Sequence, residues 1–255
     1  MGDDESEVVG RDRTLALLWR GQESPVPRRR GPSPAHTLDE VILAAVALAD
    51  ADGAAALSVR AVAAAVGMAP MSLYTHVPGM SELTDLMVDH LYLTMPRPAW
   101  GRRRWRRRVT AVAEANRDLL RAHPWLVEVV ALSRPPLGPG QMAKYEYELA
   151  AFDGTGLSDV DVDAALTFLL GFTQQQALAE RAVETARRDS GVTDAQWWAA
   201  NGPLLASVLD PARYPRAVRI GEAAGAAHGA AYDPDAAFGF GLDRLLAGLA
   251  DLIDA

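Results

Sequence analysis

The 255-residue sequence contains no cysteine, and its only lysine is Lys144. Without cysteine, the chain cannot form disulfides, thiolate metal sites or a cysteine nucleophile. No apolar run approaches the roughly 20 residues that a membrane-spanning helix needs. The acidic start MGDDESEVVG also lacks the apolar core of a secretory signal. We therefore expect a cytoplasmic protein.

Groups with the spacing of a catalytic or metal site are also missing. The five histidines are dispersed, at His36, His76, His90, His123 and His228. There is no His-Glu-x-x-His, no Gly-x-Ser-x-Gly and no glycine-rich loop after a strand. Asp159, Asp161 and Asp163 begin an expected helix, where the helix dipole already favours carboxylates. We predict no enzyme, no catalytic residue, no metal site and no cofactor.

The net charge of -8 is unevenly distributed along the chain. Residues 28–108 hold eleven arginines against seven acidic residues, a net of +4, whereas residues 109–255 carry -9 and residues 1–27 carry -3. Phosphate contacts supply most non-specific affinity for DNA. A cationic segment beside an acidic one therefore indicates a DNA-binding region joined to a domain of another kind.

The pattern of apolar residues predicts helices and no strand. Thr37 and Glu40 form a capping box, and apolar residues then follow at helical spacing until Asp52-Gly53. Ser58, Pro70 and Ser81 begin three further helices. The remaining helices are expected at 102–122, 125–132, 139–152, 159–187, 194–209 and 235–253. The fold class is therefore all-α.

The first 36 residues form an N-terminal extension. Within Arg11–Arg20, the residues Leu15, Leu18 and Trp19 share one helical face, which fits either a frayed tail or a small helix docked on the body or on a partner subunit. The link PVPRRRGPSP cannot be helical. Its arginines at 28–30 serve either as a DNA-contacting arm or as a soluble linker.

A helix-turn-helix pattern lies between Ser58 and His76, with Gly67 at the turn. The stretch LSVRAVAAAVGMAPMSLYTHVPGMSEL resembles the DNA-binding region of the tetracycline-repressor (TetR) family. SRPPLGP at 133–139 and AAFGFGLDRLLAGLADLI at 236–253 resemble later parts of the tetracycline-repressor-like branch. The resemblance implies a DNA-binding domain at 37–83, followed by a larger helical ligand-binding and dimerisation domain at 84–255.

The resemblance also implies which residues contact a DNA operator. These are Arg60, Pro70, Met71, Ser72, Tyr74, Thr75, His76 and Met80. Met71 and Ser72 would meet base edges, and Tyr74 a phosphate. Leu73 and Val77 are expected in the core. Met80 stands where the family usually has a lysine, so the N–H groups at the start of the next helix would meet the phosphate instead.

A second arginine cluster surrounds Trp105, at positions 102–104 and 106–108. Successive arginines on a helix cannot share one face, so we expect much of this cluster to be solvated. Trp105, Val109 and Val112 have the spacing of a buried stripe.

The family resemblance further implies a ligand cavity and a homodimer. Candidate lining residues are Trp125, Met142, Tyr145, Phe168, Phe172, Gln175, Trp197 and Trp198, although aromatic residues at helical spacing also fit core packing. A small hydrophobic or aromatic inducer would suit them. Residues 129–132 lack the histidine that holds a metal in the tetracycline-binding members, so no metal chelate is expected. The dimer would form through helices near 159–187 and 235–253.

These patterns predict a ligand-responsive repressor that binds a palindromic operator as a dimer. Activation instead of repression stays open. The alternative is a helical interaction or sensor protein without sequence-specific DNA binding, which would show no steep salt dependence with duplex DNA.

Overall fold

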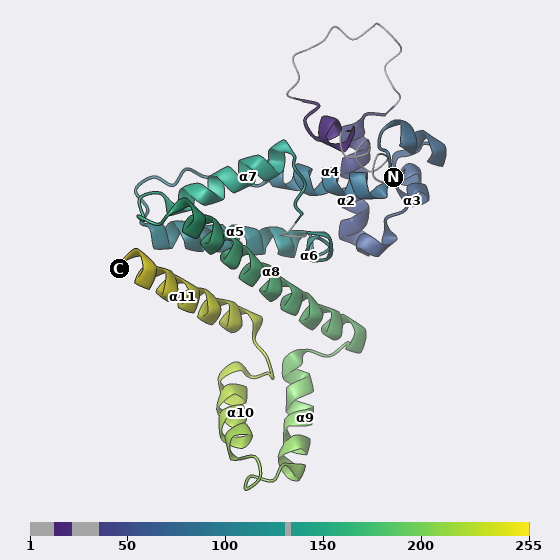
Figure 1. The fold of residues 1–255 in the computed structure, drawn as a ribbon. Helices are drawn as coiled ribbons and strands as arrows, with labels where there is room; N and C mark the ends of the chain where they lie inside the picture. Colours follow the sequence, from purple (N-terminus) through teal and green to yellow (C-terminus); the bar gives the residue numbers. More distant parts are fainter. Residues whose placement is uncertain (1–12, 22–35, 131–133, 255) are drawn as a thin grey trace, which may run out of the picture. The chain divides into compact units, whose positions relative to one another are not determined.

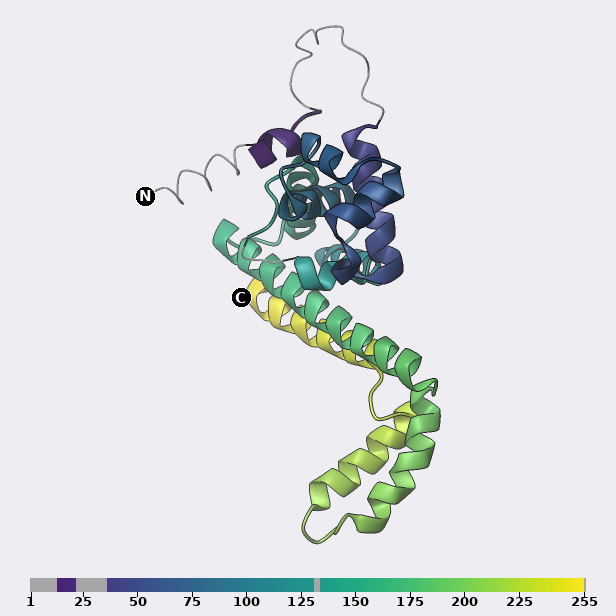
Figure 2. The ribbon, with the colours of Figure 1, turned by 90° about the vertical axis from the view of Figure 1, so that its right-hand side faces the viewer.

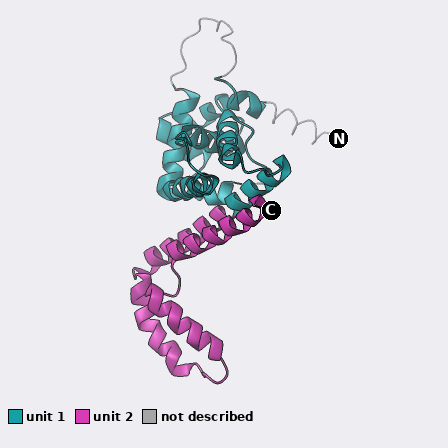
Figure 3. Ribbon diagram, turned by 90° about the vertical axis from the view of Figure 1, so that its left-hand side faces the viewer, with its two compact units in different colours: residues 1–171 teal, residues 172–255 magenta. Residues whose placement is uncertain are grey.

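The computed structural model describes residues 13–21, 36–130 and 134–254, and it divides into two compact units, residues 1–171 and 172–255 (Figure 3). All regular structure in these described ranges is helical, which confirms the all-α prediction. None of the described helices is both long enough and apolar enough to cross a membrane.

The elements follow one another along the chain, and Figure 1 labels the α-helices. The symbol η denotes a 3₁₀ helix. They are α2 (Leu38–Asp52), η1 (Ala54–Ala56), α3 (Val59–Val66), η2 (Pro70–Thr75), α4 (Met80–Thr94), α5 (Trp105–Ala122), α6 (Leu126–Val129), α7 (Pro139–Leu149), η3 (Ala150–Phe152), α8 (Asp159–Ser190), α9 (Asp194–Val208), α10 (Pro215–His228) and α11 (Pro234–Ile253). The domain boundary expected at 83/84 falls inside α4, and the division into three segments stays a prediction.

Two predicted elements need correction. The helix expected at 70–76 is the 3₁₀ helix η2, a form typical of short pieces such as this six-residue one. Helix α10 has no counterpart among the predicted helices. It contains Gly221 and Gly225, and glycine inside a helix is unfavourable, which weakens the helical signal in the sequence.

The N-terminal core is the cluster of buried side chains from α2, α3, η2, α4 and the start of α6. Helix α2 begins with the predicted capping box, in which Thr37 Oγ1 accepts from Glu40 N at 3.2 Å and Thr37 N donates to the Glu40 carboxylate at 2.8 Å. Its buried face comprises Val41, Ile42, Ala45, Val46 and Ala49. Local capping and the apolar stripe together place α2 against α3 and α4.

The short helix at 13–18 packs on this core. Leu18 is buried in it, Trp19 is packed against it, and Trp19 Nε1 donates to the Leu137 carbonyl oxygen at 2.7 Å. Leu15, predicted on the same face, is exposed. The helix therefore docks on the body of its own chain and is not a frayed tail. The predicted basic arm at 28–30 lies outside the described residues.

Helices α9 and α10 form an antiparallel hairpin in the second unit (Figure 2). Neither helix buries a residue. In the same unit, Phe172 of α8 stacks on Phe238 of α11, with ring centroids 5.5 Å apart. A Cβ atom on Gly241 would lie 2.4 Å from the Phe172 ring, so glycine permits this close approach of α8 and α11.

Candidate DNA-binding surface and sensing region

The helix-turn-helix is formed by α3, η2 and the turn at Gly67. Ser58 caps α3 by accepting from Ala61 N at 3.2 Å, and Val62 and Ala63 are fully buried. Gly67 has φ +81°, in the left-handed region where a side chain is strained. Its N–H donates to the Ala64 carbonyl, and Met68 N donates to that of Ala63, which closes the end of α3. The turn thereby sets the direction of η2.

Helix η2 separates a buried side from an exposed one. Leu73 is 1% exposed and Val77 is equally buried, which confirms that both belong to the core. Met71, by contrast, is 75% exposed, and Ser72 and Tyr74 are exposed as well. Anchoring by Leu73 and Val77 therefore presents the intervening side chains to the outside.

The hydroxyl groups on η2 differ in their availability. Thr75 Oγ1 donates to the Ser72 carbonyl oxygen at 2.7 Å, so its oxygen is left to accept a bond rather than donate one. The hydroxyls of Ser72 and Tyr74 form no hydrogen bond to any described residue. Arg60 is exposed on α3 and forms no ion pair with any described residue. These three side chains can thus all donate to an incoming phosphate or base.

The other predicted contact residues differ in exposure. Pro70 is exposed at the start of η2. His76 is half-buried, and Met80 packs against the N-terminal core. The start of α4 is not free for a phosphate, because a Cβ atom on Gly79 would lie only 2.8 Å from the Glu82 carboxylate. The helix dipole stabilises the Glu82 carboxylate in the first turn of α4, and this negative charge repels a phosphate. The sequence interpretation did not take this carboxylate into account.

The second arginine cluster is mostly solvated, as expected. Arg102, Arg103, Arg104, Arg106 and Arg107 are exposed around the start of α5, whereas Arg108 is half-buried and donates to the Asp153 carbonyl oxygen. Val109 and Val112 are buried and Trp105 is half-buried, which matches the predicted stripe.

Four predicted ligand-binding residues lie in the first unit, in different surroundings. Trp125 is 1% exposed and belongs to the N-terminal core, where its Nε1 donates to Asp50 Oδ1 at 2.7 Å. The Tyr145 hydroxyl donates to Asp163 Oδ1 at 2.6 Å, and this bond raises the pKa of the tyrosine. Met142 and Phe168 are exposed.

The other four lie in the second unit. Phe172 is half-buried against Phe238, and Gln175 and Trp197 are exposed. Trp198 fills the space between α9 and α10, where a Cβ atom on Gly225 would approach its Nε1 to 2.9 Å. Whether the eight residues form a ligand site stays a prediction.

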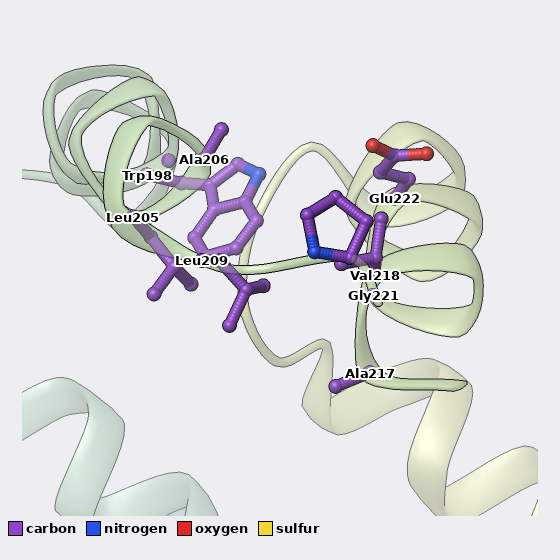
Figure 4. A pocket seen from close by; sticks show the side chains of 10 residues that line it. Trp198, Leu205, Ala206, Leu209, Ala217, Val218, Gly221 and Glu222 are labelled. Atoms are coloured by element: carbon purple, nitrogen blue, oxygen red, sulfur yellow. The ribbon is translucent and has the colours of Figure 1, made fainter. Parts of the chain in front are cut away.

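A small pocket lies beside Trp198 in the hairpin (Figure 4). Its volume is about 160 Å³, and its lining is apolar apart from Glu222. Sites for drug-sized ligands usually measure about 300–1,000 Å³. This pocket alone falls below that range, whereas the adjoining hollow, lined by Trp198, Pro203 and Gly225, has a volume of about 340 Å³.

A buried polar cluster joins α4, α5 and α7. Lys144 is 5% exposed, and its Nζ lies 2.8 Å from the buried Glu148 carboxylate and 5.0 Å from the centre of the Tyr92 ring. Asn116 Nδ2 donates to Glu148 Oε1 at 2.6 Å. Burial, followed by the Glu148 charge, raises the pKa of Tyr92. Sequence reasoning missed this cluster, although Lys144 and Glu148 at i, i+4 on one helix were a signal for a pair.

Helices α4 and α7 are in especially close contact. A Cβ atom on Gly140 would lie 1.9 Å from the Asp89 carbonyl oxygen, so only glycine fits there. The Asp89 carboxylate accepts from Gln141 N at 2.8 Å, beside the start of α7. Burial raises the pKa of Asp89, while the backbone N–H groups of Gln141 and Gly140 oppose that rise.

Comparisons with known proteins agree with this architecture. Residues 97–253 match the family model described as "Tetracyclin repressor-like, C-terminal domain". The "HTH-type transcriptional repressor DrrR1" of Streptomyces coeruleorubidus is 41% identical over 243 residues, which are 94% of this chain and 86% of that protein.

Solved structures of similar fold include ActR, a TetR family protein of Streptomyces coelicolor. Its complex with actinorhodin has a TM-score of 0.70 and 28% identity, covering 88% of this chain and 100% of ActR. Apo ActR has a TM-score of 0.68 and 27% identity, covering 87% and 98%. With a matching family model over most of the chain and a close curated relative, the protein belongs to the tetracycline-repressor (TetR) family of transcriptional repressors.

Proposed function

We propose that this repressor binds a palindromic operator as a dimer and is released by a small hydrophobic or aromatic inducer. The observation that carries the DNA-binding part is the exposed side of η2, held in place by the buried Leu73. Met71 is available for a thymine methyl group, and Ser72 for a base edge. Arg60 and Tyr74 are available to donate to phosphates, with Pro70, Thr75, His76 and Met80 beside them.

A dimer through α8 and α11 is supported by apolar side chains that these helices expose, namely Phe168, Leu178, Phe240 and Leu252. A two-fold dimer would place one η2 in each of two successive major grooves, which requires a palindromic site. The complex of ActR with actinorhodin supports the inducer part, because ActR shares the fold of this chain over most of its length.

The test is fluorescence anisotropy of the full chain with DNA from upstream of its own gene, titrated with salt and random duplex. We expect specific binding to exceed random binding by about 10³-fold or more, with a steep fall as salt rises. Ser72→Ala and Tyr74→Phe should each weaken specific binding about five- to tenfold, because each removes a polar contact. Ser207→Ala, on the exposed side of α9, is the matched control and should leave binding unchanged.

Two other outcomes would count against the proposal. Equal binding to random duplex would contradict a sequence-specific operator. Absence of both binding and salt dependence would favour a helical sensor protein that does not bind DNA.

A further inference from the structure

Asp50 bonds the last turn of α2 to the segment between α5 and α6. Its Oδ1 accepts from Trp125 Nε1 at 2.7 Å and lies 2.8 Å from His123 Nδ1. Helix α2 packs directly against α3 of the helix-turn-helix, whereas His123 ends α5 in the part that matches the C-terminal family model. These two contacts therefore join the DNA-binding side of the chain to the sensing side.

Only the Trp125 side of this joint is buried in the N-terminal core, whereas Asp50 is exposed and His123 is half-buried. Trp125 and Leu126 belong to the same cluster of buried side chains as Val46 and Ala49 of α2. Figure 1 shows α6 beside α2 and next to the C-terminal end of α5. Close-packed interiors transmit displacement rather than absorb it. A shift at the end of α5 therefore has to move α2 or break the joint.

The position of Asp50 is unfavourable for α2 itself. A carboxylate near the C-terminal end of a helix opposes the helix dipole, and the last turn of α2 contains no basic residue. Asp50 provides an acceptor for the buried indole N–H of Trp125, for which the described residues offer no other acceptor. Asp52, at the same helix end, is exposed and bonds to no described residue, so it offers a matched comparison.

We propose that the Asp50 carboxylate is a positioning group through which the sensing helices and the DNA-binding surface act on each other. This inference rests on the proposed function, since it assumes that DNA binding and inducer binding are coupled. The bonds to Trp125 and His123 make the end of α5 and the end of α2 move together. Coupling is reciprocal, so DNA bound at η2 must alter α5 through the same bonds.

The first test follows hydrogen exchange of the full chain with and without the upstream duplex. In the wild type and in Asp52→Ala, we expect the duplex to slow exchange in the C-terminal half of α5 by about fivefold or more. Asp50→Ala should lose that effect while α3 and η2 stay protected by DNA. If Asp50→Ala is merely less stable but still shows the effect in α5, the inference is wrong.

The second test needs no DNA. A double-mutant cycle combines Asp50→Ala with Trp125→Phe, which keeps a buried ring but removes the indole N–H. Trp125→Phe also leaves a cavity in either background. If the two groups act as one joint, Trp125→Phe lowers the folding equilibrium constant about fivefold less in Asp50→Ala than in the wild type. Additive effects would overturn the joint. Should the wild type show no preference for the duplex, the proposed function fails, while the cycle still decides whether the joint exists.

Discussion

The N-terminal core and the α9–α10 hairpin are both made of short capped helices, yet they are stabilised differently. Both α2 and α9 begin with a capping box, at Thr37 and Thr193 respectively. Helix α2 then buries an apolar face, whereas α9 and α10 bury nothing. Because isolated helices of about 12–15 residues are marginal in water, the hairpin must be the more easily opened of the two. Good caps therefore do not replace a core.

The largest effect is expected in the first unit, at the buried ion pair. Lys144→Met leaves the Glu148 carboxylate buried without its counter-charge, which should cost about 3–5 kcal/mol of unfolding free energy. Urea denaturation measures this loss. The double variant Lys144→Met with Glu148→Leu should recover most of it, because no unpaired charge remains. A loss below about 1 kcal/mol in the single variant would show that Glu148 is solvated after all.

A matched leucine pair compares the two regions directly. Leu86 of α4 is 2% exposed and Leu204 of α9 is 65% exposed. Leu86→Ala should lower the unfolding free energy by about 2–5 kcal/mol through a cavity. Leu204→Ala should change it by no more than about 0.5 kcal/mol. An equally large loss at Leu204, growing as the protein is diluted, would mean that a second copy covers the hairpin.

The two capping boxes provide a finer comparison. Thr37→Ala should lower the global unfolding free energy by about 1 kcal/mol, because α2 unfolds together with its core. Thr193→Ala should leave global stability unchanged and speed hydrogen exchange in the first turn of α9 about fivefold. If Thr193→Ala destabilises the whole chain as much as Thr37→Ala does, the hairpin is not an independently opening part.

The smallest effect concerns Asp89 and depends on pH. Burial raises its pKa in the folded chain above the ordinary value of 3.8. Its contribution to stability is therefore fully present below that value and is lost as pH rises through the raised pKa. Asp89→Asn should consequently be at least as stable as the wild type at pH 7 and lose this advantage toward pH 4. Ser207→Ala, exposed on α9, removes no titrating group and is the control that should show no such trend.

Local features of this fold could be predicted from the sequence, whereas features that depend on tertiary packing could not. The capping box of Thr37, the turn at Gly67 and the burial of Leu73 follow from local patterns, and the structure has all three. Helix α10 was missed because two glycines, Gly221 and Gly225, interrupt its helical pattern. For the site, exposure of Met71 agrees with the predicted DNA-binding role.

Trp125 illustrates why the sensing residues were harder to predict. An aromatic side chain at helical spacing fits a cavity wall and a core equally well, and only its neighbours decide between them. One neighbour, Asp50, lies 75 positions before Trp125 in the sequence, and the other, His123, lies 2 positions before it. The burial of Lys144 was likewise invisible, because a lone lysine usually lies at the surface.

The burial of the only lysine also makes the folded chain nearly inert to amine chemistry. An acylating reagent reacts mainly with the terminal amine, because Lys144 is buried and the arginines keep their protons. Acylation at Lys144 therefore requires α7 to open away from α4 and α5. The rate at which that one adduct accumulates therefore reports how often α7 opens, and mass spectrometry can measure it without any engineered label.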